Sequence, residues 1–265
     1  MCGALSARVP QMRRTSLLLT AALVLAGCGG TANGGSNQGA GAGGTLTVFA
    51  AASLTDVFDS LGGRFRQEHP GVDLRISYGG SSSLAAAIVQ GAPVDVFASA
   101  NAAQMDVVAG EGLAGEPAVF AANVLEIAVP PGNPAGITGL ADFAREELTL
   151  AVCAPEVPCG AAAEEVFAAA GVAARPDTQE EDVRSALLKA ELGEVDAALV
   201  YASDVDSRGT LVEGIAFPEA ERAVNDYPIC TLADAPNPGA AQAFVDLVLS
   251  EEGQRVLADA GFRTP

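Results

Sequence analysis

Residues 45–58 read Thr45-Leu-Thr-Val-Phe-Ala-Ala-Ala-Ser53-Leu-Thr-Asp-Val-Phe58, and this stretch decides the fold class. Its apolar first part, 45–50, predicts a buried strand, while apolar residues at helical spacing predict a helix over 55–68. The alternation continues with strands at 73–78 and 94–99 and with helices after residue 81 and over 101–110. Strands that alternate with helices predict a parallel sheet joined by right-handed crossovers.

The second half of the chain starts a new series of the same kind near Asn123. Strands are expected at 124–129, 148–153 and 197–201, and helices at 161–170 and 180–192. Apolar residues at helical spacing near the C-terminus predict closing helices. We therefore expect an α/β protein of two lobes, each a mixed, mostly parallel sheet flanked by helices. Lobe 1 is expected at 45–122 plus 230–265, and lobe 2 at 123–229.

The N-terminus has the pattern of a bacterial export signal. A pair of arginines at 13–14 precedes an apolar run at 17–26 that is too short for a comfortable membrane span. The run ends at Leu25-Ala-Gly-Cys28, which resembles a lipobox, where the cysteine becomes the lipidated first residue. An ordinary signal peptide with an incidental cysteine is the alternative. We expect 1–27 to be a lipoprotein signal peptide and Cys28 to anchor the protein outside the cytoplasm, on the cell membrane.

The next segment and the charge balance indicate the environment and exclude one class of partner. Residues 28–44 are rich in Gly and small polar residues, so we expect a flexible tether between the membrane and a folded body. The chain has 14 basic and 33 acidic residues, a net charge of −19. This balance argues against nucleic acid as a partner, because phosphate binding needs clustered Lys and Arg.

Three of the five cysteines fall in the predicted folded body, at Cys153, Cys159 and Cys230. An oxidising exterior and a short loop favour a structural disulfide between Cys153 and Cys159. Zinc is a competing interpretation, but the single histidine, His69, is not near these cysteines in the sequence. A redox-active pair is a further alternative, although the spacing is not Cys-x-x-Cys. We expect Cys230 to be a free buried thiol and His69 to lie on the surface.

Two strand-to-helix junctions, at 49–56 and 78–84, are rich in small hydroxyl residues. Open α/β sheets bind ligands beyond the carboxyl ends of their strands. At a helix start, free backbone N–H groups and the helix dipole attract an anion, and the Ser53 and Ser81 hydroxyls would add donors. The alternative is that these hydroxyls only cap helices. Capping explains one hydroxyl per helix, but it does not explain why both loops are small and polar.

Six motifs in order along the chain resemble those of molybdate-binding periplasmic proteins. They are Ala50-Ala-Ala-Ser-Leu54, Ser81-Ser-Ser-Leu84, Gly91-Ala-Pro-Val-Asp-Val-Phe97, Val157-Pro-Cys-Gly160, Glu181-Asp-Val-Arg184 and Val200-Tyr-Ala-Ser-Asp204. The resemblance runs from about residue 45 to the end of the chain. Each motif alone is weakly specific, whereas six collinear motifs with compatible spacing are highly specific.

The resemblance implies a two-lobed periplasmic binding protein that closes over a tetrahedral dianion in its cleft. The family's hydroxyl donors fall on Ser53, Ser81 and Tyr201. Its backbone-amide donors fall on Cys159 and Val183. These five residues are the expected oxyanion-binding site.

The sequence departs from the family pattern at two of the motifs. Many members have alanine where this chain has Cys159, a change that should be tolerated because only the backbone N–H is needed. The serine loop reads Tyr-Gly-Gly-Ser in place of aromatic-Ala-Ser-Ser, so Ser82 is an additional candidate donor. Without the resemblance, Tyr201 and Val183 would be interpreted as core residues.

The expected function is capture of molybdate, and of tungstate, for delivery to an ABC permease and its ATPase, by a monomer that needs no cofactor. Molybdate at neutral pH offers only acceptors, so its site needs donors. Sulfate is also an aprotic dianion, and a sulfate-binding protein is therefore the alternative. A secreted hydrolase is less favoured, because the chain lacks a Gly-x-Ser-x-Gly elbow and its single histidine has no triad context. We do not expect an enzyme.

Overall fold

The computed structural model describes residues 43–264. The predicted signal peptide at 1–27, the lipid site at Cys28 and nearly all of the tether lie outside the described residues. Within this range, no helix combines the length and the apolar character needed to cross a lipid bilayer.

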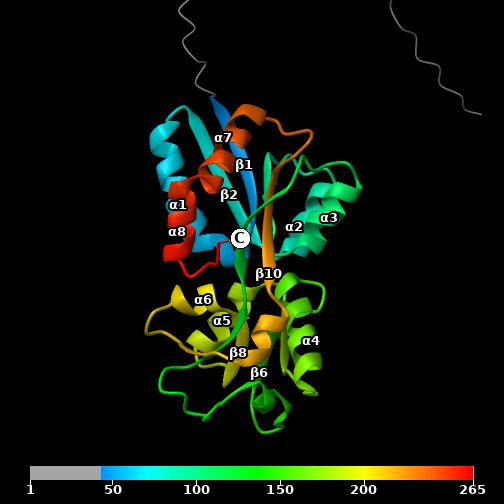
Figure 1. Ribbon diagram of the computed structural model, residues 1–265, viewed down its shortest axis with the longest axis vertical. Helices are drawn as coiled ribbons and strands as arrows, with labels where there is room; N and C mark the ends of the chain where they lie inside the picture. Colours follow the sequence, from blue (N-terminus) through cyan, green and yellow to red (C-terminus); the bar gives the residue numbers. More distant parts are fainter. Residues whose placement is uncertain (1–42, 265) are drawn as a thin grey trace, which may run out of the picture. The chain divides into compact units, whose positions relative to one another are not determined.

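The first lobe is built on a sheet of 5 strands (Figure 1). In spatial order they are β2 (Val72–Gly79), β1 (Gly44–Ala51), β3 (Val96–Ala98), β10 (Asn225–Thr231) and β4 (Ala118–Asn123). The strands β2, β1 and β3 are parallel, with Val48 opposite both Ile76 and Val96, whereas β10 runs antiparallel to both of its neighbours. The parallel part confirms the alternation predicted from the first hundred residues.

Helices cover both faces of this sheet, as Figure 1 shows. Those of one face are α1 (Thr55–Glu68), α7 (Pro238–Leu249) and α8 (Glu251–Asp259), and those of the other are α2 (Ser81–Val89) and α3 (Ala102–Gly110). Phe58 and Phe65 of α1 pack edge-on against Phe244 of α7 at 5.6 and 5.5 Å. This aromatic cluster forms the centre of the first core.

Two adjacent glycines in α1 have different roles. A Cβ at Gly62 would lie 3.2 Å from the Leu74 side chain and 3.3 Å from that of Ile76, so this glycine lets α1 approach β2 closely. A Cβ at Gly63 would meet nothing within 4 Å. Gly62 lowers the helix propensity of α1 but allows close packing against β2. Gly63 lowers the helix propensity without a packing contact that requires glycine.

The second lobe has its own sheet of 5 strands. Their order is β7 (Thr178–Glu180), β6 (Leu150–Cys153), β8 (Ala197–Tyr201), β5 (Leu125–Val129) and β9 (Glu213–Ile215). The strand β6 is parallel to β7 and β8, and β5 is antiparallel to β8 and β9. The fold is therefore the predicted two-lobed α/β fold with mixed sheets.

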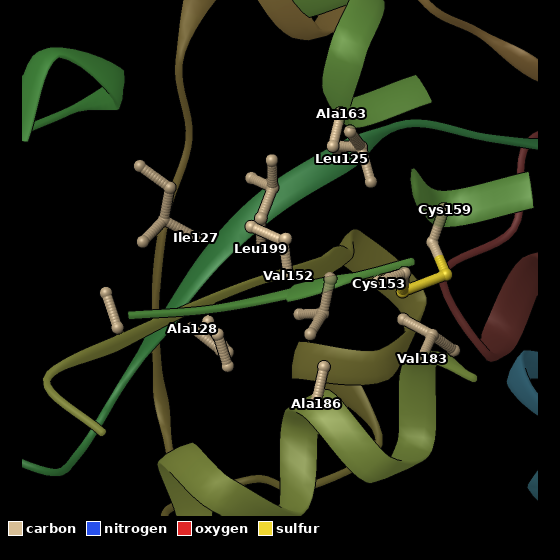
Figure 2. Close-up of a cluster of buried hydrophobic side chains, with 14 of the residues drawn as sticks. Leu125, Ile127, Ala128, Val152, Cys153, Cys159, Ala163, Val183, Ala186 and Leu199 are labelled. Atoms are coloured by element: carbon tan, nitrogen blue, oxygen red, sulfur yellow. A yellow bond between two sulfur atoms is a disulfide. The ribbon is translucent and has the colours of Figure 1, made fainter. Parts of the chain in front are cut away.

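The helices of the second lobe are α4 (Pro158–Ala170), α5 (Val183–Glu191) and α6 (Ala202–Asp206), with 3-10 turns η2 (Leu140–Ala144) and η3 (Pro218–Arg222). A further turn, η1 (Ala52–Leu54), precedes α1 in the first lobe. Figure 2 shows side chains of β5, β6 and β8 meeting Ala163 of α4 and both Val183 and Ala186 of α5 in one buried cluster. This core holds the N-terminal ends of α4 and α5 in place.

Several predicted boundaries are wrong. The chain returns to the first sheet at Asn225, where β10 begins, and not at 230, so 225–229 belong to lobe 1. The helix predicted over 180–192 begins at Val183, because the Asp182 side chain caps it and β7 precedes it. The helix predicted to begin at 161 is α4, which begins at Pro158. Proline is favoured at the first position of a helix.

Candidate anion-binding site

One small pocket is lined by residues of both lobes. The first lobe contributes the ends of β1 and β2 with the helix starts that follow them, and the second contributes the starts of α4 and α5 and the end of β8. The lining residues are Ala51, Ala52, Ser53, Gly79, Gly80, Ser81, Ala100, Val157, Pro158, Cys159, Asp182, Val183 and Tyr201. All five predicted donor residues are among them, while Ser82 is not.

Ser81 is the first residue of α2 and is 1% exposed. Its Oγ accepts a hydrogen bond of 3.0 Å from the backbone N–H of Ala100. An oxygen that already accepts this bond keeps its own O–H free to donate elsewhere. Ser81 is therefore prepared as a donor at the pocket wall.

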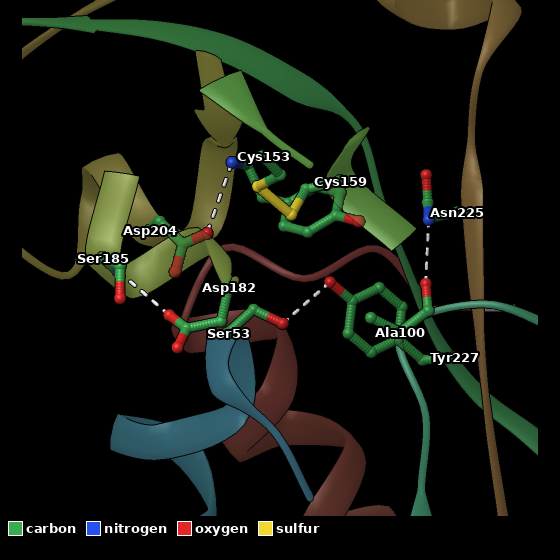
Figure 3. The surroundings of a disulfide bond; sticks show 10 residues. Ser53, Ala100, Cys153, Cys159, Asp182, Ser185, Asp204, Asn225 and Tyr227 are labelled. Atoms are coloured by element: carbon green, nitrogen blue, oxygen red, sulfur yellow. Dashed lines mark hydrogen bonds between the residues drawn. A yellow bond between two sulfur atoms is a disulfide. The ribbon is translucent and has the colours of Figure 1, made fainter. Parts of the chain in front are cut away.

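Ser53 lies in η1, at the entrance to α1, and is 4% exposed. Its Oγ is 2.9 Å from the hydroxyl oxygen of Tyr227, a residue of β10 that is 174 positions away in the chain (Figure 3). Both first-lobe serines thus have a protein partner behind them. The sequence did not indicate Tyr227, because nothing in its local pattern points to Ser53.

The first free amide of α4 belongs to Cys159. Pro158 occupies the first helical position and has no N–H, so Cys159 supplies the first backbone donor that lacks an intrahelical acceptor. The predicted disulfide is present and joins Cys159 to Cys153 at the end of β6 with a Cα–Cα distance of 5.7 Å (Figure 3). The disulfide fixes the start of α4 against the C-terminal end of β6. A Cβ at Gly160 would lie 1.8 Å from the Ala154 carbonyl oxygen, so this turn also requires glycine.

The position of Val183 is compatible with both of its interpretations, as a core residue and as an amide donor. Its side chain is 3% exposed and belongs to the second core, while its amide is the first of α5 and faces no intrahelical acceptor. The preceding Asp182 caps the helix by accepting a 2.9 Å bond from the Ser185 N–H (Figure 3). Asp182 is the one acid among the lining residues, and its Oδ1 is engaged by this cap.

The Tyr201 hydroxyl is the clearest unsatisfied group at the pocket. Tyr201 is 1% exposed, and its hydroxyl makes no well-formed hydrogen bond within residues 43–264, although the Tyr227 hydroxyl lies near it. The Tyr227 ring lies beside it, with ring centroids 6.0 Å apart. Burial, with the nearby Tyr227 and Asp204, raises the pKa of Tyr201 well above its usual value, so the phenol keeps its proton. A buried donor without a partner is costly unless a ligand accepts from it.

An arginine links the two lobes beside the pocket. Arg184 Nη2 lies 2.5 Å from Asp56 Oδ2 in the first lobe, and Arg184 Nε lies 3.0 Å from Asp204 Oδ1 in the second. Asp204 also accepts a bond of 3.3 Å from the Tyr201 N–H. Burial raises the pKa of Asp204 to about 6 even though Arg184 lowers it. Asp56 is not among the residues that line the pocket. It pairs with Arg184 instead.

The remaining predicted residues lie away from the pocket. Cys230 is a free, buried thiol, as predicted, and burial raises its pKa to about 11. His69 ends α1 and stacks on Phe65 with a centroid distance of 4.3 Å. Within residues 43–264, no cluster of His, Cys, Asp and Glu could hold a metal ion.

The pocket is therefore a set of neutral donors. The starts of three helices, α2, α4 and α5, converge on it beside the turn η1, and each helix start carries partial positive charge. The hydroxyl residues Ser53, Ser81 and Tyr201 line the same space as Cys159 and Val183, which begin α4 and α5. This arrangement can bind an anion that only accepts hydrogen bonds.

Comparisons with known proteins place the chain in a family. A model described as bacterial extracellular solute-binding protein matches residues 46–263. The molybdate-binding protein ModA of Mycobacterium tuberculosis (strain ATCC 25618 / H37Rv) is 42% identical over 253 residues, covering 94% of this chain and 96% of that protein. The ModA of Escherichia coli (strain K12) is 32% identical over 236 residues, covering 83% and 89%.

A solved structure shows the same fold. The periplasmic molybdate-binding protein of Azotobacter vinelandii has a TM-score of 0.74 at 20% identity, covering 83% of this chain and 99% of that one. These similar proteins are solute-binding proteins and not enzymes. The chain belongs to the family of bacterial extracellular solute-binding proteins.

Proposed function

We propose that this protein captures molybdate, and the isosteric tungstate, outside the cytoplasm and delivers it to an ABC permease driven by a cytoplasmic ATPase. The observation that carries the proposal is the hydrogen-bonding state of the pocket hydroxyls. Ser81 already accepts a bond from Ala100, and Tyr201 has no partner within residues 43–264. Each has a proton to donate. The similarity to ModA proteins supports molybdate as the ligand.

The donor chemistry favours an aprotic dianion over a protonated one. Hydrogen phosphate carries a proton and needs an acceptor, and the one carboxylate among the lining residues, Asp182, uses its Oδ1 to cap α5. Hydrogen bonds to a charged ligand are stronger than neutral ones, so five donors suffice without a cation in the first contact layer. Sulfate remains the alternative ligand, because it presents the same acceptors and differs in size.

We further propose that Cys28 carries the lipid anchor and that the protein acts as a monomer. The lipobox-like Leu25-Ala-Gly-Cys28 supports the anchor. Metabolic labelling with a palmitate analogue should label the wild-type protein and not a Cys28→Ala variant. Labelling of both proteins alike, or of neither, would contradict the anchor.

The ligand is tested by isothermal titration of the purified protein with molybdate, tungstate, sulfate and hydrogen phosphate. Tight one-to-one binding of molybdate and tungstate, with sulfate and hydrogen phosphate weak, is expected. Ser81→Ala and Tyr201→Phe should each weaken molybdate binding by about 1.5–3 kcal/mol, the range for hydrogen bonds to charged groups. Ser82→Ala is the matched control, because this neighbour of Ser81 does not line the pocket. Tighter binding of sulfate than of molybdate would make sulfate the ligand. Absence of measurable binding of all four anions would refute the proposal.

A further inference from the structure

Tyr227 lies directly behind a proposed ligand donor without lining the pocket itself. It is 0% exposed, and its ring packs edge-on against Phe262 at 5.5 Å and Phe120 at 6.3 Å. Its hydroxyl is 2.9 Å from Ser53 Oγ (Figure 3). Because Tyr227 is fully buried and does not line the pocket, its hydroxyl has no access to bulk water. The Asn123 and Tyr201 side chains also lie near the Tyr227 hydroxyl, but among residues 43–264 it forms a well-formed hydrogen bond with Ser53 alone, so it can control what Ser53 does.

The direction of the bond between the two hydroxyls follows from their chemistry. Either oxygen could donate, but a phenol is a stronger acid than an aliphatic alcohol and is the better donor. An anion in the pocket would draw the Ser53 proton toward itself, which leaves the Ser53 oxygen to accept from Tyr227. Hydrogen bonds arranged in such a chain polarise and strengthen one another.

The other serine shows the same arrangement with a different donor. Behind Ser81, the Ala100 N–H donates to Oγ at 3.0 Å, and a backbone N–H cannot reverse its role. Tyr227 supplies the corresponding donor behind Ser53. The two serines therefore face the pocket as matched donors, one set by the backbone and one by a phenol.

We propose that Tyr227 is a positioning residue for oxyanion binding, which donates to Ser53 and so holds the Ser53 hydroxyl as a donor to the ligand. This inference rests on the proposed function. It also explains discrimination: while Tyr227 donates to Ser53, an anion such as hydrogen phosphate that donated its own proton to Ser53 Oγ would leave the Ser53 O–H without an acceptor. Tyr227 would thus favour fully deprotonated anions without touching them.

The test is a double-mutant cycle on molybdate affinity with Tyr227→Phe, Ser53→Ala and both together. Phenylalanine keeps the ring contacts and removes only the hydroxyl. Tyr227→Phe should weaken binding about fivefold, the equivalent of one net hydrogen bond. In the Ser53→Ala background the same change should have almost no effect, because the hydroxyl through which Tyr227 acts is gone. The ratio of molybdate affinity to hydrogen phosphate affinity should also narrow in Tyr227→Phe.

The chain offers a matched control. Tyr78 lies in the same lobe, its hydroxyl donates to Asp59 at 2.7 Å, and it does not line the pocket. Tyr78→Phe should keep the wild-type affinity. The inference is overturned if Tyr227→Phe binds as the wild type does, or if it loses the same factor with and without Ser53, which would indicate a packing role. Failure of the wild type to bind molybdate would instead refute the proposed function.

Discussion

The two halves of the pocket present their donors in different ways. The first lobe offers two serine hydroxyls whose oxygens are already partnered, Ser53 with Tyr227 and Ser81 with Ala100. The second lobe offers amides of helix starts, at Cys159 and Val183, and the unpartnered hydroxyl of Tyr201. The oxygens of the first half therefore already have protein partners and only their protons are left for a ligand, whereas the second half includes a hydroxyl with no well-formed hydrogen bond within residues 43–264.

This difference indicates how binding and closure are linked. A ligand stabilises a closed form only through contacts that the open form lacks. If the anion first meets the serines of lobe 1, the donors of lobe 2 supply the additional free energy that favours closure. Variants that keep the lobes apart should thus weaken molybdate binding the most. Variants that change only one half of the pocket should weaken it less.

The largest effect is expected from Gly80→Ala, which acts on the contact between the halves. A Cβ at Gly80 would lie 2.3 Å from the backbone oxygen of Glu181 in the second lobe. Neither backbone can yield without opening the pocket, so molybdate binding should weaken by at least about 3 kcal/mol, the upper range for overpacking. Isothermal titration measures the loss, and small-angle scattering should show no compaction on adding molybdate.

Gly79→Ala is the control for this loop. A Cβ at Gly79 would meet Leu84 and Ser83 at ordinary contact distances of 3.7 Å, so the loop should tolerate it. If Gly80→Ala closed and bound as the wild type does, the close approach of the lobes would not be required for capture.

An intermediate effect is expected from removing the disulfide of the second half. The Cys153→Ala/Cys159→Ala variant keeps the amide at 159 but frees the start of α4 from β6. For a sequence separation of 6, chain entropy predicts a loss of about 2 kcal/mol in the free energy of unfolding. Binding should weaken by about 0.5–1.5 kcal/mol, because the loop must then be ordered by the ligand.

The Cys230→Ala variant is the control that separates a loss of stability from a loss of molybdate affinity. This free thiol is buried in the first lobe, away from the pocket, so its removal should lower stability and leave molybdate affinity unchanged. Should the disulfide variant also keep its affinity while losing stability, the bridge would serve the fold and not the site.

The sequence predicted the first half of this comparison better than the second. Strand–helix alternation and small hydroxyl residues are local patterns, and they were enough to locate the junctions that hold Ser53 and Ser81. The groups behind the donors were missed because they are distant in the chain: Tyr227 lies 174 residues from Ser53, and Arg184 lies 128 residues from Asp56. Periodicity does not report such contacts.

The missed strands have a related cause. The strands β7 and β9 have 3 residues each, too few for an alternating pattern to be visible. The strand β10 was not predicted and the return to lobe 1 was placed at 230, because Pro228 interrupts the pattern of β10 at the point where its register with β4 shifts. Long-range pairing, and not local propensity, holds these segments in the sheets.

The smallest effect is expected from the ion pair that joins the halves. Asp56 is 52% exposed, so solvent screens its pairing with Arg184, and Asp56→Asn should weaken molybdate binding by only about 0.5 kcal/mol, less at high salt. Asp73→Asn removes an exposed pair within one lobe and should have no effect. Equal affinities of Asp56→Asn and wild type at low salt would show that the pair does not support closure.

Arg184→Gln should behave differently, because it also leaves buried Asp204 without its cation. Its main cost should appear in the free energy of unfolding and not in binding. Asp204 has a folded-state pKa of about 6, above its ordinary value, so the folded protein binds this proton more tightly than the unfolded chain. The charged carboxylate therefore costs stability above that pH, and losing Arg184 increases the cost. The destabilisation of Arg184→Gln relative to wild type should shrink as the pH falls from 7 toward 4 in chemical denaturation. A difference independent of pH would mean that Asp204 does not depend on Arg184, and that the arginine acts mainly across the lobes.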